Sequence, residues 1–320
     1  MTPRAAKKIS VLFVLSAALA LAGCGQQTPL AASKPVQFNP ADFDGDHALF
    51  EVKSLVAVGP RDAMTPGAER ASKHIVRRLA AFGVTAETDV FTSATRAGQR
   101  VFRNIIARFP GDSSNVVIVC SHYDTKSGIP NFQGAEDSGS SSGALLEMAR
   151  MLAHREKRGP EVRLVWFDGE ECVNTYSEID GLHGSRHYAQ KLADSREIRN
   201  VLGVILLDMI GDRDLSVTIA NNNDRGLVAM ALEAAHEENA RTNFSLIPYE
   251  IGDDHVPFLE HRIPALDLID FEFGSAPGRN DYWHTSQDTL DKLSPASLQT
   301  VGRVTIRIVN KLIAQVTARR

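Results

Sequence analysis

Three short and almost uniformly apolar segments constrain the fold of this chain more than any other feature. They cover residues 116–120 (VVIVC), 162–167 (VRLVWF) and 201–207 (VLGVILL). Segments of this length with little polar alternation are typical of strands that are buried on both faces of a parallel sheet. A sheet of this kind requires helices on both of its faces.

Helical patterns separate these strands along the chain. Thr65 is followed by Pro66, as expected where a helix begins with a capping side chain and a proline at its first position. Helices are predicted over 66–79, 143–153, 184–192, 225–239 and from Ser294 to near Ala318, and further strands over 85–91, 100–109 and 265–269. This alternation predicts a single α/β domain with a mixed, mostly parallel central sheet that helices cover on both faces.

The composition is that of an ordinary globular protein. Of the 320 residues, 43% are hydrophobic and 23% are charged, which disfavours a disordered chain, collagen and a long coiled coil. The net charge of −4 argues against nucleic acid as a partner, because phosphate-binding surfaces usually carry a basic excess. Three cysteines are too few for a disulfide-stapled scaffold, and the sequence leaves open whether Cys120 and Cys172 pair.

The first residues have the pattern of an export signal. Arg4, Lys7 and Lys8 precede the apolar run 11–20, which is too short to span a bilayer. The run ends in LAGC, and small residues before Cys24 resemble a bacterial lipobox, in which the cysteine becomes acylated. The alternative is an ordinary signal peptide followed by a chance cysteine.

We therefore expect three segments in the chain. Residues 1–23 are predicted to be a lipoprotein signal peptide, residues 24–40 a polar tether that is lipidated at Cys24, and residues 41–320 the folded domain. Acyl chains on Cys24 would hold the protein on a membrane without spanning it. The expected location is the bacterial cell envelope, with the domain facing the periplasm or the exterior.

Polar side chains follow each of the three buried strands at its carboxyl end. His122 and Asp124 follow the first strand, Glu170 and Glu171 follow the second, and Asp208 follows the third. In open α/β sheets, ligands bind at the edge where the carboxyl ends of the strands meet. One charged group there would mean little, whereas three strand ends with acidic or imidazole groups predict a functional site.

A catalytic zinc site is the interpretation that these residue types favour. Histidine and carboxylates without a cysteine cluster suit zinc where three protein ligands leave one coordination position open. The candidate ligands and acid–base groups are His122, Asp124, Asp137, Glu170, Glu171, Asp208, Asp253, Asp254, His255 and His284. Adjacent glutamates point in different directions, so one of Glu170 and Glu171 can bind the metal while the other acts as acid or base. The alternative is an exposed acidic pair.

Five segments, taken together, resemble a known superfamily. They are HYD at 122–124, GAEDS at 134–138, FDGEE at 167–171, LDMIG at 207–211 and WHT at 283–285. In this order they resemble the zinc exopeptidases, which include two-zinc aminopeptidases and the animal-type glutaminyl cyclases. The resemblance extends from near Gly59 to the C-terminus and implies that 41–320 is a zinc-dependent catalytic domain.

Finer features resemble the glutaminyl cyclases more closely than the aminopeptidases. HYDTK at 122–126 looks like the cyclase segment HYDSK, and DDHVPFL at 253–259 is close to DDHIPFL. Twelve residues separate Glu171 from GSRH at 184–187, where cyclases have an insertion of this length and aminopeptidases usually have a much shorter link. We therefore favour a glutaminyl cyclase, with a two-zinc aminopeptidase as the alternative.

The resemblance implies which residues bind metal. Asp137, Glu171 and His284 match the three ligands of a single zinc ion in the cyclases. His122 and Asp208 occupy the places of second-zinc ligands in the aminopeptidases, although cyclases that bind one zinc retain both. One zinc ion per chain is expected for a cyclase, and two for an aminopeptidase.

The resemblance also implies roles in catalysis and substrate binding. Glu170 matches the general base and acid, and Asp208 and Asp253 match an acidic network that holds it through hydrogen bonds. Trp283 matches an aromatic wall of the substrate pocket. Tyr176 stands where animal cyclases have a pocket tryptophan, which implies a narrower or more polar wall in this chain.

The implied activity is conversion of an N-terminal Gln of a peptide or protein into pyroglutamate. The α-amine attacks the γ-amide carbonyl of the same residue and ammonia leaves, so that no activated water is needed. A third alternative, from a different class, is a lipid-anchored binding protein with an inactive site. It is the weakest of the three because every implied ligand and the implied base are present.

Overall fold

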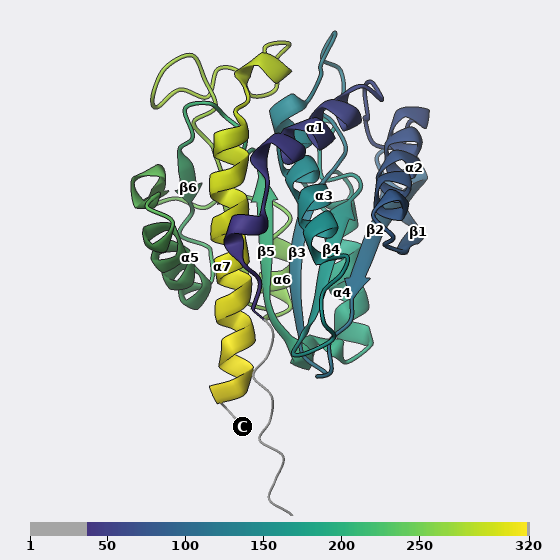
Figure 1. The fold of residues 1–320 in the computed structure, drawn as a ribbon. Coiled ribbons are helices and arrows are strands. Elements are labelled where there is room, and N and C mark those ends of the chain that lie inside the picture. Colours follow the sequence, from purple (N-terminus) through teal and green to yellow (C-terminus); the bar gives the residue numbers. More distant parts are fainter. Residues whose placement is uncertain (1–36, 319–320) are drawn as a thin grey trace, which may run out of the picture. The chain divides into compact units, whose positions relative to one another are not determined.

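An eight-stranded sheet forms the centre of the part of the chain that the structure describes, residues 37–318 of a computed structural model (Figure 1). Its strands are β1 (Ala86–Thr95), β2 (Gly98–Phe109), β3 (Val116–His122), β4 (Glu161–Phe167), β5 (Val201–Asp208), β6 (Val217–Ile219), β7 (Phe244–Leu246) and β8 (Ala265–Ile269). They follow the order β1-β2-β4-β3-β5-β8-β6-β7. The central strands β4, β3, β5 and β8 are parallel, while β1 and β2 form an antiparallel hairpin at one edge.

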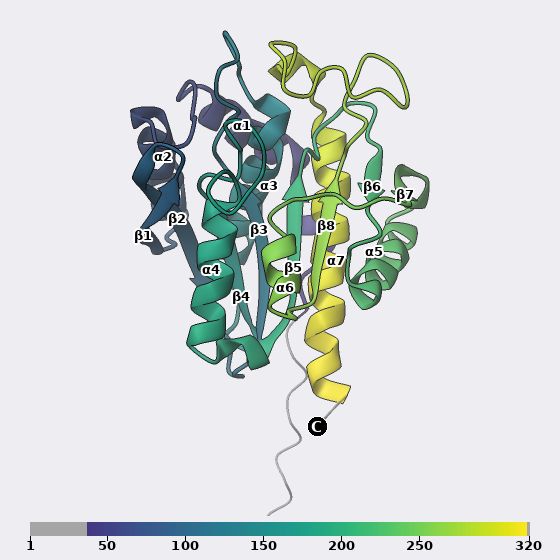
Figure 2. The same ribbon diagram turned by 180° about the vertical axis from the view of Figure 1, so that it is seen from behind.

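Helices cover both faces of this sheet. They are α1 (Gly45–Val56), α2 (Pro66–Ala81), α3 (Ser141–Leu152), α4 (His183–Asp194), α5 (Arg225–Glu237), α6 (Val256–Glu260) and α7 (Pro295–Ala318). Figure 1 shows α1, α3 and α7 in front of one face, and the reverse view in Figure 2 shows α4 and α6 in front of the other. The larger apolar core lies on the α1–α3–α7 face, and a smaller one, which includes Phe167, Tyr188 and Phe258, lies under α4 and α6.

The predicted α/β fold with a mixed, mostly parallel sheet is confirmed. Every helix and strand that the sequence predicts is present, with bounds that differ by a few residues. The short helix α6 and the three-residue strands β6 and β7 were not predicted. Helix α1 begins at a conventional cap, because the Asp44 side chain accepts hydrogen bonds from the backbone N–H groups of Asp46 and His47.

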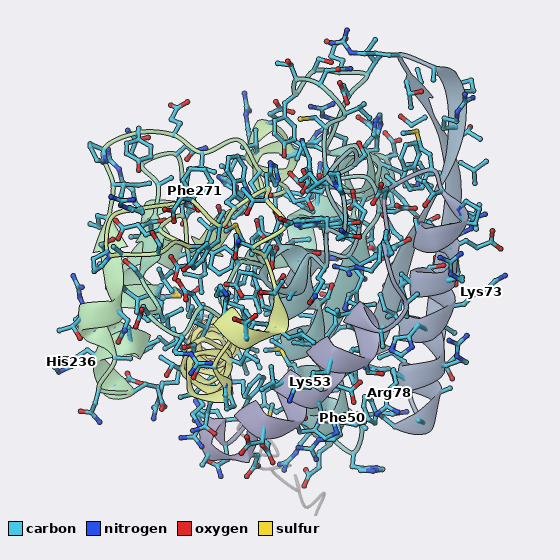
Figure 3. All side chains as sticks on the ribbon, turned by 90° about the horizontal axis from the view of Figure 1, so that it is seen from above. Phe50, Lys53, Lys73, Arg78, His236 and Phe271 are labelled. Carbon is cyan, nitrogen blue, oxygen red and sulfur yellow. The ribbon has the colours of Figure 1, made fainter. Side chains whose placement is uncertain are left out.

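Helices α1 and α2 are joined by an ion pair between a buried carboxylate and a partly exposed guanidinium. The Arg78 guanidinium donates hydrogen bonds to both carboxylate oxygens of Glu51, at 2.7 and 2.6 Å. Its central carbon, Cζ, lies 5.6 Å from the centre of the Phe50 ring (Figure 3). A bidentate pair of this kind fixes orientation as well as distance. The α1–α2 connection is thereby held in place, and it carries the buried Arg61, which is important for the site below.

The structure shows the state of Cys120 and Cys172, whereas the predicted N-terminal segments lie almost entirely outside the described residues. Cys120 and Cys172 are both buried and both free. The predicted signal peptide, the acylation of Cys24 and most of the predicted tether lie outside the described residues. Within residues 37–318, none of the helices combines the length and the apolar character that crossing a bilayer requires.

Candidate active site and metal centre

The carboxyl ends of the central strands bring the predicted polar residues together. His122 ends β3 beside Phe167, the last residue of β4, and Asp208 ends β5. His122 Nε2 lies 3.4 Å from Asp208 Oδ1. The prediction that a site forms at this edge of the sheet agrees with this geometry.

One cluster of potential metal ligands contains Asp137, Glu171 and His284. His284 Nε2 lies 3.2 Å from Asp137 Oδ2 and 3.0 Å from Glu171 Oε1. The three residues offer ligand atoms that all lie within 4.8 Å of one another. We call this cluster the loop-side group. Glu171 and His284 lie between regular elements, and Asp137 lies in the irregular segment Ala135–Ser140.

A second cluster shares Asp137 and adds two residues at strand ends. His122 Nε2 lies 3.1 Å from Asp137 Oδ1 as well as near Asp208. We call His122, Asp137 and Asp208 the strand-side group; their ligand atoms also lie within 4.8 Å of one another. On its other ring nitrogen, His122 Nδ1 lies 3.5 Å from Asp124 Oδ1.

The donor atoms of both groups fit a bound metal ion. His122 Nδ1 and Nε2, Glu171 Oε2 and Asp208 Oδ1 are buried without a well-formed hydrogen bond among the described residues. Buried polar atoms normally have a hydrogen-bond partner. Carboxylates that lie close together repel one another unless a cation lies between them. One imidazole and two carboxylates in each group form a donor set that zinc accepts.

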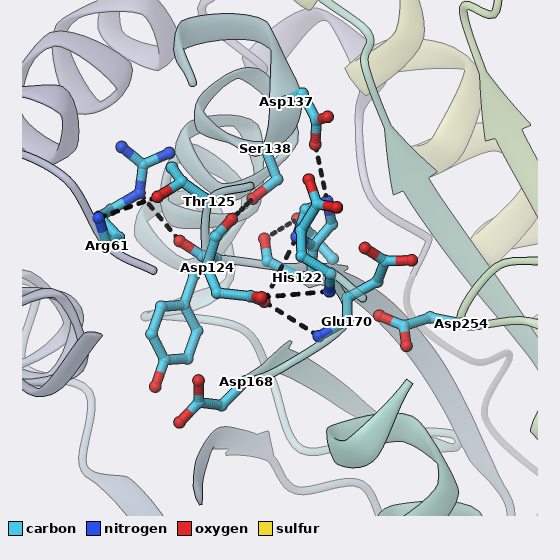
Figure 4. Close-up of polar contacts among 12 residues, drawn as sticks. Arg61, His122, Asp124, Thr125, Asp137, Ser138, Asp168, Glu170 and Asp254 are labelled. Atoms are coloured by element: carbon cyan, nitrogen blue, oxygen red, sulfur yellow. Dashed lines mark hydrogen bonds and ion pairs between the residues drawn. The ribbon is translucent and has the colours of Figure 1, made fainter. Parts of the chain in front are cut away.

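Five of the ten candidate residues fall in these groups and five do not. The five residues outside them are Asp124, Glu170, Asp253, Asp254 and His255. Asp124 lies behind the glutamate pair: its two carboxylate oxygens accept hydrogen bonds from the backbone N–H groups of Glu170 and Glu171, at 3.1 and 3.2 Å (Figure 4). Asp124 therefore orients the pair and is not itself placed to bind the same metal ion.

The two glutamates point to different partners, as the sequence predicts. Glu171 Oε1 meets His284, whereas Glu170 Oε1 accepts a hydrogen bond of 2.8 Å from the hydroxyl of Tyr176. They are only 5% and 6% exposed, so the alternative of an exposed acidic pair is wrong. Burial raises the pKa of Glu171 to about 7, and the Asp137 carboxylate contributes to the rise.

Glu170 borders a buried cluster of acidic side chains. Burial raises the pKa of the Glu170 carboxyl well above its usual range, and Glu171 and Asp253 add to this rise. Burial also raises the pKa of Asp253, with Asp267 and Asp208 as the largest charged contributors. Like charges in a dry environment share protons, so this cluster can hold a proton close to Glu170.

Asp267 belongs to that cluster, and His255 lies beside it. Asp267 was not among the predicted site residues, yet its fully buried side chain lies in the middle of β8. The only sequence signal for it is a single acid in the otherwise apolar segment ALDLI. His255, one of the ten candidate residues, lies with Nδ1 3.8 Å from Asp267 Oδ2.

Residues far away in the sequence hold the segment that carries Asp137. Asp288 accepts hydrogen bonds from the backbone N–H groups of Glu136 and Asp137, at 2.7 and 3.1 Å. Arg61 donates to the backbone oxygens of Gln133 and Gly134, at 3.0 and 2.8 Å. Asp288 and Arg61 are both buried and neither was predicted.

Lys126 supports the loop-side group from the opposite side of Glu171. Its ammonium nitrogen lies 3.4 Å from Glu171 Oε2 and donates a hydrogen bond of 2.6 Å to the backbone oxygen of Cys172. Glu171 thus has a histidine at one carboxylate oxygen and a cation at the other. The lysine belongs to the HYDTK segment, so its proximity in sequence to His122 was the available signal.

Two aromatic residues contact the site. The Trp283 ring stacks on the His284 ring, with centroids 3.9 Å apart, and packs edge-on against Phe271 at 5.2 Å. Tyr176 is 40% exposed, and its hydroxyl lies on Glu170. Both predicted substrate-binding residues therefore lie next to a ligand or to the implied base.

Comparison with known proteins places the chain in a family. Residues 104–309 match peptidase family M28. A glutaminyl-peptide cyclotransferase from Boiga irregularis is 30% identical over 278 residues, which cover 75% of this chain and 74% of that protein.

Solved structures agree with this placement. A glutaminyl cyclase from an Acidobacteriales bacterium has a TM-score of 0.80 at 34% identity, covering 89% of this chain and 100% of that one. A Zn-dependent exopeptidase from Parabacteroides distasonis has a TM-score of 0.74 at 26% identity, covering 84% and 98%. The chain therefore belongs to the zinc-dependent glutaminyl cyclases of peptidase family M28.

Proposed function

We propose that this chain converts the N-terminal Gln of peptides and proteins into pyroglutamate and ammonia with one zinc ion, held by Asp137, Glu171 and His284. The observation that carries the proposal is the divergence of the glutamate pair. Glu171 is directed into the loop-side group, and Glu170 is directed away from it towards the acidic cluster. A zinc ion in the loop-side group supplies Lewis-acid polarisation of the γ-amide carbonyl of the substrate.

Glu170 is the residue that we assign to proton transfer. The free α-amine of the substrate attacks the γ-carbonyl carbon, and the Glu170 carboxylate takes one proton from the attacking nitrogen. The same carboxyl group then delivers the proton to the departing amide nitrogen, which leaves as ammonia. Asp208 and Asp253 lie in the acidic cluster with Glu170 and share the proton between these two steps.

Trp283 and Tyr176 are assigned to substrate positioning. The ring of Trp283, fixed against His284 and Phe271, forms one wall of the site. An aromatic wall beside the reacting groups favours the bent conformer in which amine and carbonyl meet, and it excludes water from them. Exclusion of water matters because a cyclase gains nothing from a hydrolytic nucleophile.

The second candidate function is that of a two-zinc aminopeptidase. The observation that favours it is the intact strand-side group, in which His122, Asp137 and Asp208 meet with the geometry of a second ligand set. Asp137 would then bridge two ions. Metal content and substrate preference together separate the two candidates.

The experiment is a paired assay on one zinc-loaded preparation. We expect ammonia release from peptides with N-terminal Gln, no hydrolysis of Leu or Ala amides, and one zinc ion per chain by elemental analysis. Glu170→Gln should lower kcat by about a hundredfold or more while zinc stays bound. Glu178→Gln is the matched control, because Glu178 is an exposed glutamate in the loop that follows the pair.

Hydrolysis of amino-acid amides by a preparation that releases no ammonia from Gln peptides would reject the cyclase in favour of the peptidase. Activity retained in Glu170→Gln would reject the assignment of the base. An inactive protein with either substrate, with zinc bound, would support the third alternative, a binding protein.

We also propose that residues 1–23 are removed and that the mature protein is held on the bacterial envelope by acyl chains on Cys24. The support is the order of basic residues, apolar run and LAGC in the sequence. In a bacterial host, Cys24→Ser should move the protein from the membrane fraction to the soluble envelope fraction. An unchanged membrane fraction would show that Cys24 is not the anchor.

A further inference from the structure

The segment between Glu171 and α4 is folded around one carboxylate. Asp180 is only 4% exposed and accepts hydrogen bonds from three successive backbone N–H groups, those of residues 173–175, at 2.6, 3.1 and 3.3 Å. Arg96, from the β1–β2 turn, donates a fourth at 3.2 Å. Four donors on one carboxylate give this loop a defined conformation although it contains no helix or strand.

That conformation places the Tyr176 ring on a glycine. Gly181 has φ +87°, and a Cβ at this position would lie 2.5 Å from Cδ1 of the tyrosine ring. Only a residue without a side chain can therefore occupy position 181 while the ring lies there. The next residue, Leu182, donates its backbone N–H to the backbone oxygen of Glu170 at 2.8 Å. The loop is thus tied to Glu170 through its main chain as well.

The outcome of this arrangement is the hydrogen bond of 2.8 Å from the Tyr176 hydroxyl to Glu170 Oε1. Among the described residues, no other hydrogen bond or ion pair reaches the Glu170 carboxylate. A glutamate side chain has three rotatable bonds, and the neighbouring acids Asp253 and Glu171 repel its charged form. Without the hydroxyl, nothing in the described part of the chain would hold this carboxylate in one orientation.

We propose that Tyr176 is a positioning residue that holds Oε1 of Glu170 and leaves Oε2 to exchange the proton with the substrate. The inference deepens the proposed function and rests on the assignment of Glu170 as the base. The proton balance is simple: the tyrosine keeps its own proton throughout. The proton that leaves the attacking α-amine goes to Oε2 and then to the departing nitrogen. A fixed Oε2 matters because a displacement of about 1 Å from the reacting atoms can cost a hundredfold in rate.

The test is Tyr176→Phe in the zinc-loaded enzyme, which removes the hydroxyl and keeps the ring on Gly181. We expect kcat to fall about tenfold or more, as for a lost hydrogen bond to a charged group, while KM stays within about twofold. Zinc content should not change. Crystal structures of both proteins should show Glu170 in one orientation in the parent and in several in the variant. Tyr249→Phe, at an exposed tyrosine that donates no hydrogen bond among the described residues, is the matched control.

A second variant tests whether the loop acts through the same hydroxyl. Asp180→Asn replaces one of the two carboxylate oxygens around which the loop folds with an amide nitrogen, which cannot accept these hydrogen bonds. This variant should also lower kcat. The double variant Asp180→Asn, Tyr176→Phe should then be no slower than the slower single variant. Multiplied losses would mean that the loop acts independently of Tyr176, and they would overturn the proposal.

Two further results would overturn the proposal. One is a kcat within about twofold of the parent for Tyr176→Phe, or a loss confined to KM, which would leave the tyrosine as a binding surface only. The other is a single, unchanged orientation of Glu170 in the crystal structure of the variant. This structural readout decides the inference even if the parent protein releases no ammonia from Gln peptides, a result that would reject the proposed function separately.

Discussion

The strand-side and loop-side groups share Asp137 and yet differ in how the chain builds them. In the strand-side group, His122 and Asp208 are the last residues of adjacent buried strands, and the His122 side chain is 1% exposed. In the loop-side group, Glu171 follows a turn and His284, at φ +53°, is 18% exposed. The sheet by itself places the first pair, whereas the second depends on contacts between loops.

Those contacts explain how loops can hold a metal ion precisely enough. Asp124 fixes the backbone of the glutamate pair, Asp288 fixes the backbone of Asp137, and Lys126 faces Glu171. Partners that orient ligands in this way commonly matter for metal affinity nearly as much as the ligands do. The loop-side group is therefore the more adjustable of the two and also the one that a small change can damage more easily.

Loss of a loop-side ligand should have the largest effect. In His284→Ala we expect zinc content close to zero and cyclisation reduced by about a thousandfold, because the polarising ion is lost. Elemental analysis and an ammonia-release assay measure both quantities. His236→Ala, on the exposed surface of α5 (Figure 3), should change neither. A variant that keeps its zinc would show that the ion is not held by the loop-side group.

Loss of a strand-side residue should have a smaller effect that leaves the metal in place. In His122→Ala we expect one zinc ion per chain, as in the parent, and activity lowered by about tenfold to a hundredfold. The reason is that His122 lies among Asp124, Asp137 and Asp208, and its removal leaves these buried carboxylates without their basic neighbour. A parent with two zinc ions and a variant with one would reverse the comparison and favour the peptidase.

The difference between the groups also explains what the sequence could predict. His122 and Asp208 were predictable from one rule, because apolar segments locate the strands and polar residues at their carboxyl ends must meet. The short elements β6, β7 and α6 were missed because three to five residues carry too little periodicity to identify.

The supporting residues of the loop-side group could not be found in this way. Asp288 lies 151 residues from Asp137 in the sequence, and Arg61 lies 73 residues from Gly134. Their contacts depend on how loops pack after the sheet has formed, which no local pattern records. The hydrogen bond from Tyr176 to Glu170 belongs to the same class: the residue was predicted at the site, but its hydroxyl contact depends on the fold of the 172–182 loop.

Removal of the charge that faces Glu171 should weaken zinc binding without abolishing it. In Lys126→Met we expect zinc to dissociate about ten times more readily, in the range found when partners of metal ligands are removed. Competition with a chromogenic chelator measures this. Lys73→Met, on the surface of α2, is the control because Lys73 is exposed and, within residues 37–318, its one ion pair is with Glu69 on the same helix. Equal zinc affinity in Lys126→Met and the parent would mean that Lys126 does not orient Glu171.

The smallest expected effect is a pH-dependent loosening of the 172–182 loop. Burial alone would raise the pKa of Asp180, but the hydrogen bonds from residues 173–175 and Arg96 outweigh it and lower the pKa below its usual value. The stabilisation is therefore complete above the unfolded-state pKa of about 3.9, and it is lost as the pH falls through the lower folded-state pKa. Hydrogen exchange of residues 173–175, corrected for intrinsic rates, should show protection falling by about tenfold across that range.

The strand that ends in His122 supplies the internal reference for this measurement, because residues 116–120 of β3 are buried and paired on both sides. Their protection should stay high where that of the loop is lost. Asp180→Asn should show low loop protection at every pH, since an amide offers no charged acceptor. Loop and strand amides that lose protection at one common pH would mean that the two groups unfold together, and the contrast between a fixed and an adjustable side of the site would then be wrong.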